Sequence, residues 1–133
     1  MTYKYGQQIL TQILKMVLDG QKNNTALELR VMAMIKESKV KETIKKILSD
    51  EGIYYFMPSG NGYGRSAIPD FVCCVNGKFL AIEAKADALK PTLLQARELS
   101  RIFDAGGTGI YVNATNVDQL SHLLKGLKND STK

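Results

Sequence analysis

Apolar residues recur along the first half of the chain with the spacing of amphipathic helices. The pattern predicts one helix over 7–18, a second from Thr25 to about residue 35, and a third that starts at Glu37 and closes at Gly52. The second helix is apolar on more than one side. This predicts burial, either against the protein's own core or against another subunit.

The third helix carries an acidic residue on its apolar face. With 3.6 residues per turn, Glu37 lies on the same stripe as Val40, Ile44 and Leu48, whereas Glu42 lies nearly opposite. An acid in this position is either a first-turn charge favoured by the helix dipole or part of a functional site. The periodicity alone leaves both interpretations open.

In the second half of the chain, short apolar runs separated by turn residues predict strands. The dipeptide Asn76-Gly77 between two such runs is typical of a two-residue hairpin turn. Proline before a periodic segment and glycine after it mark the ends of a further helix. The predicted elements are strands over 53–57, 71–75 and 79–82, a helix from Pro91-Thr92 to Phe103, a strand over 109–112 and a helix over about 117–127.

The predicted hairpin brings charged residues together at its open end. Asp70 starts the outgoing strand and Glu83 ends the returning one, so they lie side by side. Strand alternation places Glu83 and Lys85 on one face, with Ala84 pointing away. Two convergent carboxylates suit a hard divalent cation, and a neighbouring lysine can orient or deprotonate water. The alternative is that Asp70 caps a turn and the other two are ordinary exposed charges.

Composition narrows the classes of function. The chain has 133 residues, a net charge of +5 and 44% hydrophobic residues, which fits one globular domain and a polyanionic partner. No apolar run reaches membrane-spanning length, and no secretory signal is evident. Cys73 and Cys74 point to opposite faces of a strand, which predicts two buried thiols in a reducing, cytoplasmic compartment. His122 is the only histidine, so zinc and Ser-His-Asp chemistry are not expected.

Glycines crowd the loop over 58–66, which also contains Tyr63 and Arg65. The loop lacks the order of a P-loop or dinucleotide motif, because no Gly-Lys-Ser follows and a strand rather than a helix comes next. Beside an acidic site, an aromatic ring and a guanidinium suit contact with phosphate. A simple flexible connection is the alternative.

Taken in order, these features resemble the VRR-NUC family of the PD-(D/E)XK restriction-endonuclease-like superfamily, and small phage-type members in particular. The resemblance covers about Glu37 to Val112. Its matching features are Glu37 with the stripe that follows it, the glycine-rich loop, Ile68-Pro69-Asp70, Glu83-Ala84-Lys85, Pro91-Thr92 with Gln95, and Gly106-Gly107.

The resemblance implies an α/β fold with an αβββαβ core, a mixed central sheet and flanking helices. It divides the chain into an N-terminal helical extension over 1–36, a nuclease domain over 37–128 and a polar tail over 129–133. The catalytic positions carry over to Glu37, Asp70, Glu83 and Lys85, with Gln95 as an auxiliary residue. The candidates for contact with DNA are Tyr63, Arg65, Lys78 and Lys90.

The implied activity is Mg²⁺- or Mn²⁺-dependent hydrolysis of DNA phosphodiester bonds by an endonuclease. Asp70, Glu83 and the main-chain carbonyl of Ala84 would hold the metal, and Glu37 would act directly, through water or on a second ion. Stand-alone members resemble structure-selective endonucleases, including homodimers that resolve four-way Holliday junctions. The N-terminal helices are a candidate dimer interface, and the alternative is a layer packed on the protein's own core. A non-catalytic nucleic-acid-binding or assembly module on the same fold is the alternative.

Overall fold

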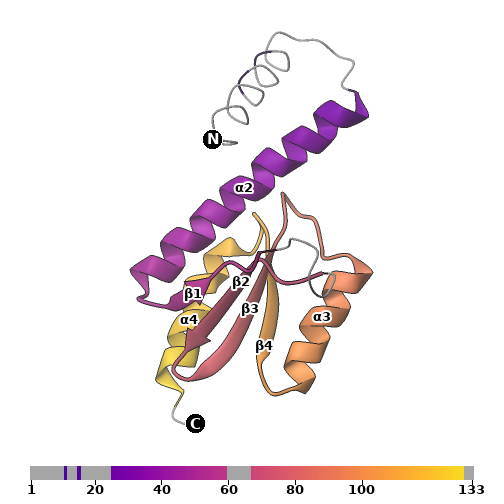
Figure 1. Ribbon diagram of the computed structural model, residues 1–133. Coiled ribbons are helices and arrows are strands. Elements are labelled where there is room, and N and C mark those ends of the chain that lie inside the picture. Colours follow the sequence, from indigo (N-terminus) through magenta and orange to yellow (C-terminus); the bar gives the residue numbers. More distant parts are fainter. Residues whose placement is uncertain (1–10, 12–14, 16–24, 60–66, 131–133) are drawn as a thin grey trace.

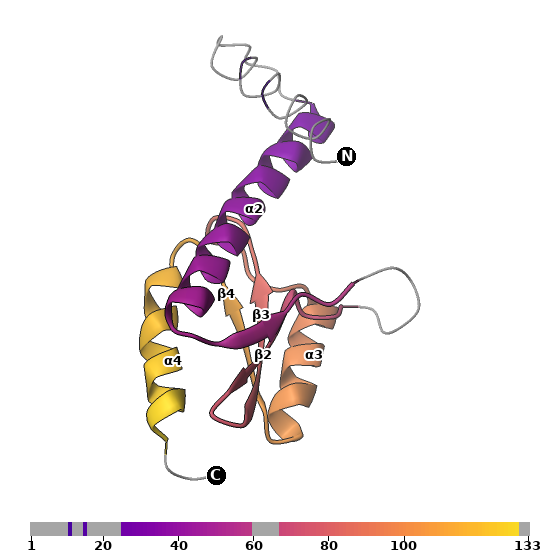
Figure 2. The ribbon, with the colours of Figure 1, turned by 60° about the vertical axis from the view of Figure 1, so that its left-hand side comes forward.

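Four strands form the centre of the computed structural model, which describes residues 25–59 and 67–130 together with Thr11 and Lys15 (Figure 1). The sheet order is β1-β2-β3-β4; the first two pairings are antiparallel and β3 runs parallel to β4. Helix α3 covers one face, and α2 and α4 cover the other (Figure 2). The strands are β1 (Tyr54–Phe56), β2 (Phe71–Val75), β3 (Lys78–Ala84) and β4 (Thr108–Val112). The predicted α/β architecture is confirmed.

The predicted hairpin between β2 and β3 is present. Asn76 and Gly77 have φ values of 53° and 78°, the left-handed conformation that a two-residue turn of type I′ requires at both positions. Phe71 pairs with Ile82 across the hairpin. The residues just outside this pair, Asp70 and Glu83, are therefore opposite one another.

Helix α2 (Ala26–Asp50) is continuous, so the prediction of separate helices on either side of residue 36 is wrong. Thr25 and Glu28 form a reciprocal capping box at its start. The stripe of Val40, Ile44 and Leu48 is buried in the core, as predicted.

The first half of α2 is not buried against the protein's own core, which was one of the two alternatives. Leu27, Leu29 and Met34 are more than half exposed. The reason is geometric, because this half of the helix extends beyond the sheet, which gives it no strand to pack on (Figure 1). The predicted helix over 7–18 lies outside the described residues, apart from Thr11 and Lys15.

Helix α3 (Leu93–Asp104) is the crossover between the parallel strands β3 and β4. Its N-cap is Thr92, so Pro91 precedes the cap rather than lying in the first turn. The helix packs closely on β4, where a Cβ on Gly109 would lie 2.8 Å from the carbonyl oxygen of Leu99. Glycine at this position permits the close approach.

On the opposite face, α2 packs with α4 (Leu120–Asn129), which follows the short 3₁₀ helix η1 (Val117–Gln119). Leu120 and Leu124 join the core there. Cys73 points into this core, but Cys74 is exposed, so the expectation of two buried thiols is wrong. The cause is that α3 contacts β3 and β4, whereas the outer face of β1 and β2 has no helix of the described part of the chain packed on it. Among the described residues, no helix has the length and apolar character needed to cross a membrane.

Candidate active site

Two carboxyl groups meet at the open end of the β2–β3 hairpin. Oδ2 of Asp70 accepts a hydrogen bond of 2.8 Å from the main-chain N–H of Ala84. Glu83, on the adjacent strand, is only 5% exposed and hydrogen-bonds Asp70 through its side chain. The strand register thus fixes the two acids in contact, as the sequence predicted.

The environment of Glu83 opposes its ionisation. Burial, the negative charge of Asp70, the hydrogen bond to Asp70 and the charge of Glu37 raise the pKa of Glu83 from 4.5 to about 8, although Lys85 acts in the opposite direction. Two carboxylates in contact repel one another unless a proton or a cation lies between them. A divalent ion would meet this demand with the oxygen donors that Mg²⁺ and Mn²⁺ favour.

Gln95, in the first turn of α3, links Glu83 to Lys85. Its Nε2 donates a 2.8 Å hydrogen bond to Oε1 of Glu83, and its Oε1 accepts a 3.3 Å bond from Nζ of Lys85. The same Oε1 accepts from the backbone N–H of Thr92, which completes the N-terminal capping box of α3. One amide side chain therefore orients both charged groups and caps the helix.

Glu37 approaches the site from the middle of α2, so it is not a first-turn charge stabilised by the helix dipole. A residue that the sequence did not single out, Lys41, lies beside it. Nζ of Lys41 is 3.8 Å from Oε2 of Glu37 and 3.4 Å from Oδ1 of Asp70. The glutamate–lysine spacing of four residues on one helix face was a signal for this pair, but nothing local showed that Lys41 would also reach Asp70.

The donors that fit an ion are Asp70, Glu83 and the main-chain carbonyl of Ala84. The N–H of Ala84 points towards Asp70 on the β2 side, and the N–H and C=O of a strand residue project to the same side. Within the described residues, no three side chains of Asp, Glu, His or Cys are grouped closely enough to hold a metal. A metal at this site would therefore need a main-chain oxygen in addition to the two side chains.

The predicted DNA contacts are distributed differently. Lys78 begins β3, at the end of the strand opposite Glu83, and pairs with Asp130, so the structure does not bring it to the site. Lys90 is exposed in the segment between β3 and α3. Tyr63 and Arg65 lie outside the described residues.

A buried asparagine after β4 holds the segment that carries Lys85 and Lys90. Nδ2 of Asn113 donates to the carbonyl of Leu89 (2.9 Å), and the N–H of Ala114 donates to the carbonyl of Asp87 (2.9 Å). Asn113 is 3% exposed, and its Oδ1 accepts from both the N–H and the hydroxyl of Thr115. These contacts fix the connection between strand and helix at the edge of the site.

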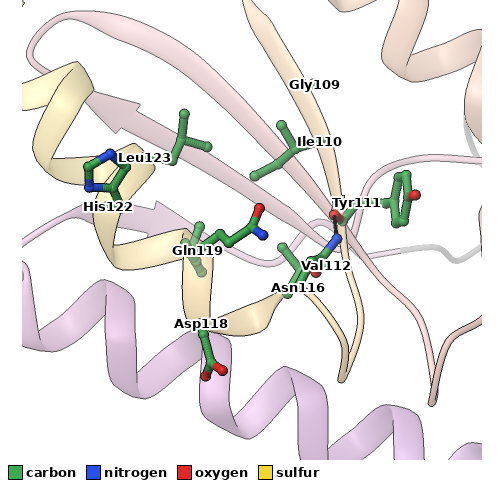
Figure 3. Close-up of a pocket in the computed structure, with 10 residues that line it drawn as sticks. Gly109, Ile110, Tyr111, Val112, Asn116, Asp118, Gln119, His122 and Leu123 are labelled. Carbon is green, nitrogen blue, oxygen red and sulfur yellow. Dashed lines mark hydrogen bonds between the residues drawn. The ribbon is translucent and has the colours of Figure 1, made fainter.

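A separate cavity of about 680 Å³ lies between β4 and the η1–α4 segment (Figure 3). Ile110, Val112 and Leu123 give it an apolar lining, and Nδ2 of Asn116 donates to the carbonyl of Tyr111 at its rim (3.1 Å). It is lined by none of the five predicted catalytic residues. The paired acids lie on the α3 face of the sheet instead, where Glu83 contacts Gln95.

Comparison with known proteins identifies similar nucleases. No protein-family model matches the chain. A protein named "Putative nuclease p44", from Acyrthosiphon pisum secondary endosymbiont phage 1, is 32% identical over 91 residues, which cover 67% of this chain and 95% of that protein. A solved structure named "VRR_NUC domain" matches with a TM-score of 0.58 and 29% identity, over 65% of this chain and 95% of that one.

The mixed sheet with paired acids and a lysine at one end defines a nuclease of the restriction-endonuclease-like class. Within that class, the chain belongs to the VRR-NUC family.

Proposed function

We propose that this protein is a Mg²⁺- or Mn²⁺-dependent endodeoxyribonuclease. The observation that carries the proposal is the contact between Asp70 and Glu83: burial and the negative charge of Asp70 raise the pKa of Glu83, and a bound cation would offset that charge. Lys85 lies on the same face and is tied to Glu83 through Gln95. A purely structural ion pair would not need a buried glutamate in contact with a second, partly exposed acid.

Each residue of the site has a distinct role in this proposal. Asp70, Glu83 and the carbonyl of Ala84 hold the ion, which when bound lowers the pKa of water and stabilises negative charge on the phosphate. Lys85 orients the attacking water and offsets the charge that develops on the phosphate. Gln95 keeps Glu83 and Lys85 at a fixed separation.

The substrate we propose is DNA recognised by shape and backbone rather than by a long base sequence. A net charge of +5 attracts the phosphate backbone, and the exposed Lys90 remains a candidate for contact with it. One small domain has little area with which to read base edges. Branched DNA, in particular a four-way junction, meets these conditions.

For a four-way junction, two cuts related by symmetry are needed, which a two-fold homodimer supplies. The exposed apolar side chains Leu27, Leu29 and Met34 on the first half of α2 support this assembly. We propose this helix as the dimer interface. Light scattering of the protein and of a Leu27→Glu/Met34→Glu variant tests it, since the charged variant should be monomeric.

Cleavage assays test the activity itself. Labelled four-way, flap, single-stranded and linear duplex DNA are incubated with Mg²⁺, Mn²⁺ or EDTA, beside Lys85→Ala as the inactive variant. Symmetric cutting of the four-way junction, lost in EDTA and in the variant, supports a junction-resolving nuclease. Cutting of another substrate retains the nuclease and rejects junction selectivity. Tight binding of DNA without cutting favours the non-catalytic module.

A further inference from the structure

Glu37, Asp70 and Glu83 form an acidic cluster, and the partly buried Lys41 lies on one side of it. Its ammonium group is 3.4 Å from Oδ1 of Asp70 and 3.8 Å from Oε2 of Glu37, and the side chain is 28% exposed. Lys85 lies beside Glu83 on the other side, where its positive charge opposes the rise in the pKa of Glu83. Lys41 therefore offsets the charges of Glu37 and Asp70, and Lys85 offsets that of Glu83.

The geometry explains why this division matters. Each oxygen of Asp70 already has a partner, Oδ1 with Lys41 and Oδ2 with the N–H of Ala84. A carboxylate oxygen has two lone pairs, so Asp70 can still bind one ion on the side of Glu83. Between Asp70 and Glu37, however, the ammonium lies where a second ion would need to bind.

The net charge of the site also favours a single divalent ion. Glu37, Asp70 and Glu83, when ionised, carry three negative charges, and Lys41 and Lys85 carry two positive ones. One divalent ion changes the net charge of this group from −1 to +1, which suits a phosphodiester anion. A second would leave +3 at close range, and like charges in a partly buried site repel strongly.

We propose that Lys41 is a positioning residue that restricts the site to one divalent ion. Its ammonium replaces a second metal between Glu37 and Asp70 and holds Asp70 directed at the remaining ion. The proposal rests on the metal-dependent nuclease function described above. It assigns Glu37 the role of anchoring Lys41 rather than that of a direct ligand.

Metal stoichiometry without DNA tests this directly. Mn²⁺ bound per chain is counted from the loss of the free-ion paramagnetic resonance signal, at slightly alkaline pH so that protons do not compete. The variants are Lys41→Met, which removes the charge, Lys41→Gln, which keeps polarity, and Lys41→Arg, which restores a cation. Lys45→Met is the matched control, since Lys45 lies one turn further along α2 and pairs with Glu42. Circular dichroism confirms that each variant is folded.

We expect one Mn²⁺ for the native chain, Lys41→Arg and Lys45→Met, and two for Lys41→Met and Lys41→Gln. Two ions in the native chain, or one in every variant, would overturn the proposal while leaving a nuclease that still cuts DNA. Absence of Mn²⁺ binding and of cleavage in the native chain would reject the proposed function together with this inference. If one of the two neutral variants fails to fold, the other carries the comparison with Lys41→Arg.

Discussion

The main-chain N–H of Ala84 donates a hydrogen bond of 2.8 Å to the side chain of Asp70. This contact crosses from β3 to the residue that precedes β2, so it fixes an acidic side chain to the strand that carries Glu83 and Lys85. The position of Asp70 is thereby set by the backbone of its neighbour rather than by its own rotamer preference. The site is held by the rigid hairpin rather than by a loop.

Lys85→Ala should reduce DNA cleavage by a factor of about 10²–10⁴, the usual contribution of a group that assists proton transfer. Lys85 contacts Gln95, and its loss removes the cation next to Glu83. Single-turnover cleavage rates measure the effect. The control is Lys46→Ala, because Lys46 is exposed on α2 and forms an ion pair with Asp50. Equal activity of the two variants would remove Lys85 from the mechanism.

Gln95→Glu should lower cleavage by roughly 10–100-fold, as expected for the loss of a residue that orients metal ligands. Glutamate preserves the capping-box acceptor for Thr92 but cannot donate to Glu83. Thr92→Ala should do the reverse, costing about 1 kcal/mol of stability through loss of the cap while leaving cleavage nearly unchanged. Cleavage rates and thermal melting of both variants separate the two roles. If Thr92→Ala were the less active variant, the cap would matter more than the contact with Glu83.

The metal-free protein should lose stability as the pH rises from about 4.5 to about 8. In this window the folded state keeps the Glu83 proton while the unfolded chain has released it, so the folded state binds more protons and stability falls with pH. The contribution is at most about 1.4 kcal/mol per pH unit. Denaturant unfolding in EDTA measures the slope, and Glu83→Gln should flatten it. An equal slope in that variant would assign the effect to other groups.

Gly109→Ala should destabilise the protein by about 1–3 kcal/mol, the usual cost of overpacking. The added methyl group would lie 2.8 Å from the carbonyl oxygen of Leu99, and α3 would have to move away from β4. Gly126→Ala in α4 is the control, since a Cβ there meets no atom within 4 Å, and should stabilise the helix by about 0.5–1 kcal/mol. Urea unfolding of both variants gives the comparison. A neutral Gly109→Ala would mean that the helix can shift freely.

Iodoacetamide should modify Cys74 and spare Cys73 in the native protein. Cys74 is exposed, whereas Cys73 is 2% exposed and burial raises the pKa of its thiol to about 12. Intact-mass spectrometry should show one adduct, and none for Cys74→Ser. Two adducts under native conditions would indicate that the core opens around β2.

The parts of the site that sequence could predict are those fixed by short-range geometry. The Asn76-Gly77 turn sets the register, and the register places Asp70 opposite Glu83. Helical periodicity likewise placed Glu37, rather than Glu42, on the apolar face of its helix. Lys41 was missed because a lysine on a helix is by default solvated, and its contact with Asp70 depends on how α2 crosses the end of the sheet. Only the packed structure contains that information.

The errors in the fold have the same origin. Cys74 was expected to be buried because its strand is apolar, yet burial depends on which strands α3 covers. The first half of α2 was expected to be buried because it is apolar, yet it extends beyond the sheet. In both cases the local pattern identified the type of secondary structure, and the arrangement of distant elements decided its exposure.

Gln95 both caps α3 and holds Glu83 and Lys85, so the proposed activity depends on the folding of this helix. The side chain of Gln95 caps the start of α3 and also hydrogen-bonds both Glu83 and Lys85. A nascent or partly unfolded chain contains every reactive group, yet lacks the helix start that arranges them. The proposed DNA cleavage would therefore depend on the folded start of α3 as well as on the reactive groups themselves.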